Sequence, residues 1–84
     1  MKSKGFPLSL APAYRDLEIV DVNAGCGLKT RLGDMGIVPG SIVRLVSPET
    51  NGPVIVEVKG SRLALGRGAA QRVIVVERLS EEER

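Results

Sequence analysis

The chain has 84 residues, of which 43% are hydrophobic and 26% charged, so it is long enough for one small globular domain. Its net charge of +2 is too weak to indicate nucleic-acid binding by itself, and its single cysteine excludes an internal disulfide bond. Because no stretch reaches the roughly 18 apolar residues of a membrane span and the start lacks a signal peptide's apolar segment, we expect a soluble cytoplasmic protein.

The first quarter of the chain predicts two strands. In FPLSLAP, Leu8 and Leu10 are two positions apart, which predicts a short strand with both side chains on one face. Residues 17–22 combine apolar and acidic side chains in a strand-like pattern, and they predict a strand of about six residues.

The period then changes to that of a helix. Leu28, Leu32 and Met35 recur at spacings of four and three, which places them on one face of a helix of about two turns. Gly36 fits the position after the helix end, where positive φ is required, whereas we expect no such requirement at Gly5. Ile37 and Leu32 then occupy the two positions that touch in a Schellman ending.

The second half predicts short strands separated by turns. Pro39 and Gly40 fit the central positions of a type II turn that leads into the next strand. Turn clusters follow at 48–53 and 59–61, and RGAAQR (67–72) is too short for more than one helical turn. The strands expected between these turns lie at about residues 41–47, 54–58, 62–66 and 73–79, the first two as a hairpin.

Five to six short strands with one two-turn helix indicate a mainly β protein. One small helix cannot cover both faces of an open sheet, so the sheet is expected to curl on itself into a small, partly open barrel. We expect a single domain over residues 1–84, with its core at about 6–78 and a polar tail at 79–84. The strand edges of an open barrel are also a route to homo-oligomers.

The residues needed for common active sites are missing. The chain has no histidine and one cysteine, so neither a zinc site of imidazole and thiolate nor an activated serine nucleophile can form within it. We therefore predict no enzyme activity, no catalytic residue and no cofactor. A metal is left only between chains through Cys26, or on carboxylates, of which Asp16, Glu18 and Asp21 are close in sequence; our main interpretation of the three acids is a solvated strand face.

A basic face offers an alternative function. Small barrels often bind nucleic acids, and the second half of the chain carries basic residues that could form a stripe, namely Arg44, Lys59, Arg62, Arg67 and Arg72. Single-strand binders stack bases on aromatic rings, however, and Phe6 and Tyr14 are the only aromatic residues. Nucleic-acid binding is therefore kept as the alternative and is not expected.

Three stretches together resemble a known family. FPLSLAPA, IVDVNAGCGLKTRLGDMGIVPGSIVRLVS and GPVIVEVKGSRLALGRGAAQRVIV are similar to the FeoA family, the small cytosolic proteins of bacterial and archaeal ferrous iron uptake. The resemblance implies an SH3-like barrel, a fold that also appears as a C-terminal domain in metal-dependent repressors. It further implies a partner or regulator of the FeoB-type iron permease, recruited through that partner to the inner face of the membrane. One departure is Ala13-Tyr14, where family members often carry glycine.

The stretch RLGDMGIVPGS combines a structural and a functional prediction. The structural part consists of Leu28, Leu32, Gly36, Ile37, Pro39 and Gly40, which join the helix to the barrel and start the next strand. Arg31 and Asp34 can pair at i, i+3, but such a pair is worth only about 0.2–0.5 kcal/mol and is not structurally necessary. We therefore predict that Arg31, Asp34 and Met35 form a partner-binding surface.

Overall fold

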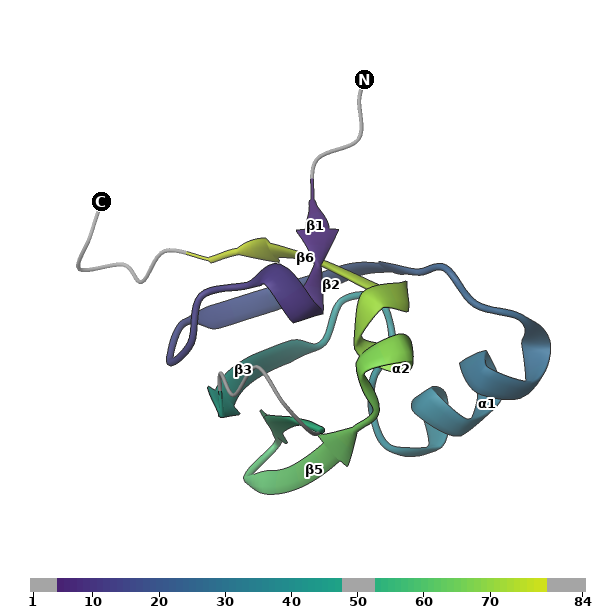
Figure 1. The fold of residues 1–84 in the computed structure, drawn as a ribbon. Coiled ribbons are helices and arrows are strands. Elements are labelled where there is room, and N and C mark those ends of the chain that lie inside the picture. The colour runs from purple at the N-terminus through teal and green to yellow at the C-terminus, as the bar shows by residue number, and fades with distance from the viewer. Residues whose placement is uncertain (1–4, 48–52, 79–84) are drawn as a thin grey trace.

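The computed structural model describes residues 5–47 and 53–78, which form one antiparallel sheet with short helices at its ends and edges (Figure 1). The six strands lie in the order β1-β6-β2-β3-β4-β5. Their bounds are β1 Phe6–Pro7, β2 Asp16–Val22, β3 Ile42–Ser47, β4 Val54–Val58, β5 Ser61–Leu65 and β6 Val73–Glu77. The described residues also form a short 3-10 helix, η1 (Leu8–Leu10), and two α-helices, α1 (Cys26–Asp34) and α2 (Arg67–Arg72).

The sheet curls but does not close. Its two outer strands, β1 and β5, each pair with one neighbour and not with each other. This arrangement confirms the predicted mainly β, partly open small barrel, including the hairpin of β3 and β4. The turn cluster predicted at 48–53 lies mostly outside the described residues, and so does the predicted tail at 79–84.

The core is built by alternation along the strands, because successive side chains of a strand point to opposite faces. Leu17 and Ile19 of β2 point inward, and a bulge between Ile19 and Asp21 then shifts the alternation by one residue. The shift allows Val22 to be buried, while Val20 and Asp21 both face solvent. The buried side chains of the described residues are all apolar; the largest are Leu8, Leu17, Ile19, Leu32, Ile37, Val43, Val56, Val73 and Val75.

The prediction of a strand with Leu8 and Leu10 on one face was wrong. Only Phe6 and Pro7 pair as a strand, and the next three residues form η1, closed by the Ala11 N–H donating to the Leu8 carbonyl at 3.0 Å. A 3-10 helix has three residues per turn, so residues two apart point in different directions. Accordingly, Leu8 is 1% exposed and Leu10 is 73% exposed.

The segment 67–72 is more helical than its length indicated. It forms the six-residue helix α2, although Gly68 lies inside it and Gly66 at its N-cap offers no side-chain hydrogen bond. Ala70 is fully buried, and α2 lies against η1 and the end of β6. Packing of a small apolar face therefore outweighs the weak intrinsic helix propensity of the segment.

Candidate functional site

The end of α1 is closed by the backbone pattern that the sequence predicted. The Ile37 N–H donates to the Leu32 carbonyl and the Gly36 N–H donates to the Gly33 carbonyl, both at 2.9 Å. These are the two hydrogen bonds of a Schellman ending, and Gly36 has the positive φ of 91° that this ending requires. The predicted role of Gly36 as the residue after the helix end is confirmed.

The turn that follows attaches the helix-to-strand corner, residues 31–41 from the last turn of α1 up to β3, to the middle of the sheet. Gly40 has φ of 95°, and the Ser41 N–H donates to the Val38 carbonyl at 3.0 Å, as expected for a turn with Pro39 and Gly40 at its centre. The Gly40 N–H donates to the Ile19 carbonyl at 2.7 Å, and the Ile19 N–H donates to the Ser41 carbonyl at 2.9 Å. The backbone of the turn is therefore hydrogen-bonded to Ile19, the residue of β2 at which the bulge in that strand begins.

The expectation that Gly5 carries no conformational requirement was wrong. Gly5 has φ of 131°, and a Cβ atom placed there would lie 2.8 Å from Cγ2 of Ile74. The cause is the close approach of the chain to β6 just before β1 begins, which the local sequence does not reveal.

A small apolar contact holds α1 against the barrel, as Leu28, Leu32 and Ile37 were predicted to do. Leu32 and Ile37 are buried, and Leu28 is half-buried against the same core. The rest of α1 stands away from the sheet at one end of the molecule (Figure 1). Its N-cap, Gly25, makes no side-chain hydrogen bond, and Gly27 and Gly33 weaken the helix itself. Tertiary contact at its C-terminal half therefore carries most of its stability.

Arg31, Asp34 and Met35 lie together on the last turn of α1 and just beyond it. Both charged side chains are exposed, and Met35 is 37% exposed although it continues the helix-like spacing of Leu28 and Leu32. The predicted pairing of the two charges is not observed: among the residues described, the ion pairs join other side chains. The three residues of the predicted surface are thus available for contact.

Asp34 is at a position where the helix dipole disfavours a negative charge. It is the last residue of α1, where the partial negative charge of the carbonyl ends accumulates. A carboxylate there is unfavourable by about 0.3–1 kcal/mol, whereas Arg31 in the same turn is favourable. Stability of the isolated domain does not explain an acidic residue at this position.

Further apolar side chains surround the corner, and the sequence did not single them out. Val38 is 40% exposed and follows Met35 across the helix ending. Val20 and Ile42 are the chain neighbours of the hydrogen-bonded Ile19 and Ser41, and both are exposed to a similar degree. The bulge in β2 turns Val20 outward, and a bulge has no signature in the sequence that would have revealed this.

The predicted acidic face of β2 is used for ion pairs. Asp16 accepts a hydrogen bond from Nη2 of Arg44 at 2.7 Å, and Glu18 accepts one from Nη1 of Arg78 at 3.2 Å. The hydrogen bond and charge of Asp16 raise the pKa of Arg44, and the charge of Glu57 on β4 acts in the same direction. Asp21 accepts a hydrogen bond from the Val22 N–H instead.

Among the residues that the structure describes, neither Cys26 nor the acidic side chains form a recognisable metal centre. Within 5–47 and 53–78, no three His, Cys, Asp or Glu side chains lie close enough together to hold an ion. Cys26 is an exposed thiol at the first position of α1.

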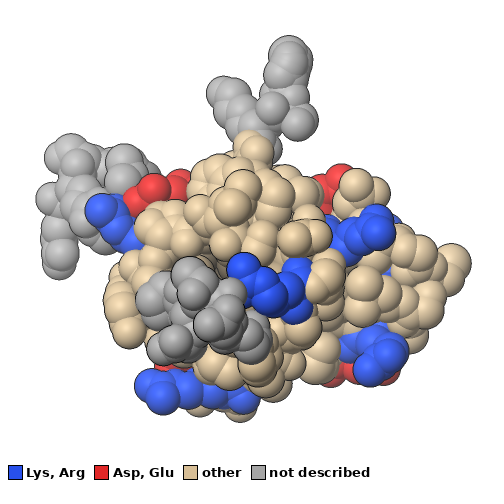
Figure 2. All heavy atoms as spheres, in the orientation of Figure 1, with Lys and Arg blue, Asp and Glu red and all other residues tan. Residues whose placement is uncertain are grey.

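The basic residues of the alternative function are spread over different parts of the molecule. Arg44 is paired with Asp16 on the outer face of the sheet, and Arg72 donates to the Asn23 carbonyl at 3.5 Å. On the face shown in Figure 2, the basic side chains form separate groups, with residues that are neither basic nor acidic between them. Phe6 packs against the core, which leaves Tyr14 as the one exposed aromatic side chain of the described residues.

Comparison with known proteins identifies the family. The FeoA domain model matches residues 6–77. The chain belongs to the FeoA family. A Methanocaldococcus jannaschii protein, provisionally named Fe(2+) transport protein A, is 40% identical over 70 residues, which cover 83% of this chain and 84% of that protein. The family of this chain is thus associated with Fe(2+) transport, as the sequence resemblance implied.

Solved structures agree with the fold. A crystal structure of an iron uptake regulatory protein (FeoA) superposes with a TM-score of 0.83 at 31% identity, over 89% of this chain and all of that one. A manganese-dependent transcriptional repressor shares the fold at 21% identity and a TM-score of 0.76, and the match covers 93% of this chain and 44% of the repressor. The SH3-like barrel is therefore common to FeoA proteins and to part of a metal-responsive repressor.

The departure from the FeoA pattern at Tyr14 has a structural counterpart. Tyr14 adopts a positive φ of 63°, a conformation that glycine reaches without strain, and its N–H donates to the Leu45 carbonyl at 2.7 Å. The first turn thus forms with tyrosine in a glycine-like conformation. No helix in the described part of the chain has the length and apolar character to cross a bilayer.

Proposed function

We propose that this FeoA-family protein is a non-enzymatic accessory of ferrous iron uptake that acts by contact with a FeoB-type iron permease. The contact surface is the end of α1, formed by Arg31, Asp34 and Met35, with Val38 beside them. In this proposal the protein works in the cytoplasm and is held at the inner face of the membrane through the permease.

The placement of Asp34 is the observation that carries the proposal. An exposed carboxylate at the negative end of a helix, with no ion-pair partner among the described residues, works against the stability of α1. A cationic side chain of a partner would remove this penalty and gain a charge-assisted hydrogen bond. Arg31 adds an opposite charge in the same turn, which favours a partner surface that carries both signs.

The apolar part of the surface supports the same conclusion. Met35 is flexible and half-exposed, and methionine adapts well to a partner surface. An apolar centre flanked by charged residues is the usual composition of a protein interface. The surface lies where α1 meets the barrel, so a partner that contacts it can also reach the exposed apolar side chains of Val20 and Ile42.

The test is calorimetric binding of the full chain to the cytosolic GTPase region of the cognate permease, with and without a GTP analogue. We expect binding that Asp34→Asn and Met35→Ala each weaken by about fivefold or more, which corresponds to roughly 1 kcal/mol at an interface. Lys29→Ala, an exposed change one turn earlier on α1, is the matched control and should leave the affinity unchanged.

Two results would contradict the proposal. Folded Asp34→Asn and Met35→Ala proteins that bind with unaltered affinity would remove the role of α1. Absence of binding to the GTPase region, together with salt-sensitive binding to a single-stranded RNA oligomer, would instead favour the nucleic-acid alternative.

A further inference from the structure

Strand β5 leaves its outer edge open. It pairs with β4 along Ser61–Leu65 and ends the sheet, away from β1 (Figure 1). The turn between β4 and β5 has two central residues, Lys59 and Gly60, both with positive φ, so Val58 and Ser61 form a hydrogen-bonded pair. Since such pairs alternate along an antiparallel ladder, the N–H and C=O groups of Arg62 and Ala64 point away from β4.

No other described segment uses these backbone groups. The backbone hydrogen bonds of turns, loops and caps among the described residues include none from Arg62 or Ala64. Their side chains are exposed on the outer face of the sheet, where Arg62 is opposite Glu57 and Ala64 is opposite Ile55. The edge therefore combines available backbone groups with an exposed cation and a small apolar side chain.

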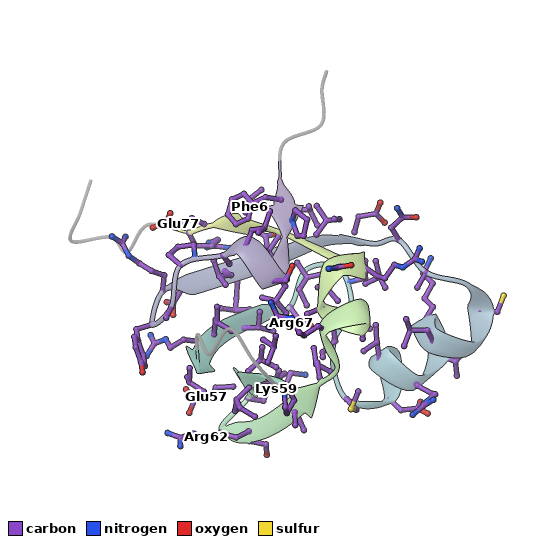
Figure 3. The ribbon with its side chains drawn as sticks, viewed as in Figure 1. Phe6, Glu57, Lys59, Arg62, Arg67 and Glu77 are labelled. Atoms are coloured by element: carbon purple, nitrogen blue, oxygen red, sulfur yellow. The ribbon has the colours of Figure 1, made fainter. Side chains whose placement is uncertain are left out.

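A row of alternating charges leads across the sheet to this edge. Asp16 on β2, Arg44 on β3, Glu57 on β4 and Arg62 on β5 are successive cross-strand partners. The first pair forms a salt bridge at 2.7 Å, and Figure 3 shows Glu57 and Arg62 extending from the sheet on the same side. Opposite charges in neighbouring strands stabilise their pairing. The row ends on a positive charge that has no strand beyond it.

We propose that the β5 edge binds an extended acidic segment of another protein by antiparallel strand addition. Backbone hydrogen bonds to Arg62 and Ala64 supply the affinity, as in other cases where a peptide joins a sheet edge. An acidic residue opposite Arg62 continues the alternating row, and a β-branched residue opposite Ala64 covers the apolar area that Ala64 shares with Ile55. The segment thus carries an apolar residue two positions before an acidic one.

Charge makes an acidic partner a better occupant than a second copy of this chain. If two β5 strands paired antiparallel with Arg62 opposite Arg62 or Ala64 of the second copy, the two Arg62 side chains would lie opposite or diagonal to each other. Like charges in these positions disfavour pairing, and a basic residue on an edge is a common protection against self-association. The same charge attracts an acidic strand, so Arg62 favours an acidic segment of another protein over a second copy of β5. The site contains no residue of α1, and its test is independent of the proposed function.

The test uses nuclear magnetic resonance of the labelled full chain with a capped peptide, Thr-Thr-Val-Thr-Glu-Thr-Thr, at millimolar concentration. Control peptides carry Lys in place of Glu, or N-methyl groups on the backbone amides that would face β5. We expect shift changes centred on Arg62 and Ala64, slower exchange of these two amides, and loss of both effects with the methylated peptide. Arg62→Glu should weaken binding of the Glu peptide by about fivefold and improve binding of the Lys peptide.

Further variants make the outcome decisive. Ala64→Pro removes an outward N–H at an edge position where proline is tolerated, and it should abolish binding while the dispersion of the spectrum is kept. Lys29→Glu on α1 changes the net charge equally and should have no effect. Binding that survives N-methylation, binding equally reduced by Lys29→Glu, shift changes elsewhere, absence of any shift change, or self-association through the β5 amides would each overturn the proposal.

Discussion

Replacing Gly36 by alanine tests whether the end of α1 depends on its backbone conformation. Gly36 has φ of 91°, in the region where an L-residue with a Cβ atom costs roughly 1–2 kcal/mol. The new Cβ atom itself would lie 3.4 Å from Cγ1 of Val58, an ordinary contact, so sterics with the barrel add little. Alanine also lowers the conformational entropy of the unfolded chain, which stabilises the folded state by about 0.4–1 kcal/mol and offsets part of this cost. The net expectation is a loss of about 1 kcal/mol in the free energy of unfolding.

Gly27→Ala is the matched comparison because Gly27 lies inside α1, whereas Gly36 follows its end. A Cβ atom at Gly27 would meet no atom outside the neighbouring backbone of its own helix within 4 Å, and the φ of Gly27 is not positive. Alanine within a helix is favoured over glycine by roughly 0.5–1 kcal/mol, so this variant should be more stable than the parent protein. The two variants therefore have opposite expected signs, although each adds one methyl group, either inside α1 or directly after it.

Thermal unfolding followed by circular dichroism resolves the difference. For a domain of this size, 1 kcal/mol corresponds to a shift of about 4–8 °C in Tm, down for Gly36→Ala and up for Gly27→Ala. Gly36→Asn should fall between Gly36→Ala and the parent, because asparagine tolerates positive φ better than alanine does. Equal Tm values for Gly36→Ala and Gly27→Ala would refute the assignment of Gly36 as the residue that closes the helix.

Three more predictions follow from single observations. Leu8→Ala should cost about 2–5 kcal/mol in unfolding free energy and Leu10→Ala less than about 0.5, by urea denaturation, because only Leu8 is buried; similar losses would contradict η1. Asp34→Asn should raise the unfolding free energy by about 0.3–1 kcal/mol in the same assay, and a decrease would mean that Asp34 has a stabilising partner. The urea midpoint should stay constant from pH 6 to 8, since the chain has no histidine. The raised pKa of Arg44 gives a contribution that is fully present below the ordinary pKa of arginine and lost only at still higher pH, so a marked slope between pH 6 and 8 would reveal another titrating group.

The corner was predictable from sequence because its requirements are local. Positive φ at Gly36 and Gly40 and the fixed φ of Pro39 are properties of single residues, and they determine the helix ending and the turn without reference to the rest of the fold. The burial of Leu32 and Ile37 followed from the same pattern. The hydrogen bonds between this turn and Ile19 could not be predicted from the sequence, because they depend on the order of the strands in the sheet.

The errors have a common physical origin in tertiary contact. Leu8 and Leu10 have the spacing of a strand, but η1 rotates them apart so that Leu8 can reach the core. Ala70 becomes helical because α2 is covered by η1, which is distant in sequence. Gly5 is constrained by a strand near the other end of the chain. Propensity and periodicity describe neighbours along the chain and cannot report such contacts.

The candidate sites also differ in whether they depend on local spacing or on tertiary contacts. Arg31, Asp34 and Met35 were found from helical spacing and do lie together, but their charges do not pair with each other. The pairing of Asp16 with Arg44, and the row that continues to β5, depend on strand register. Register follows from turn geometry and bulges and cannot be read from composition.

The position of β6 in the sheet has a consequence for how the chain folds as it is synthesised. β6 lies between β1 and β2, so β1 and one edge of β2 wait for residues 73–77 before their backbone groups are paired, whereas the other edge of β2 pairs with β3. The hairpins β3–β4 and β4–β5 join strands that are adjacent in sequence, and they can form while the chain is still growing. From this topology we expect folding to be completed in a late step by insertion of β6, which covers the core residues Leu17 and Ile19 and pairs with β1 from the start of the domain. A ribosome-bound chain that ends before Val73 should expose Leu17 and Ile19 to chaperones. A chain whose β6, up to Glu77, has left the ribosome should not.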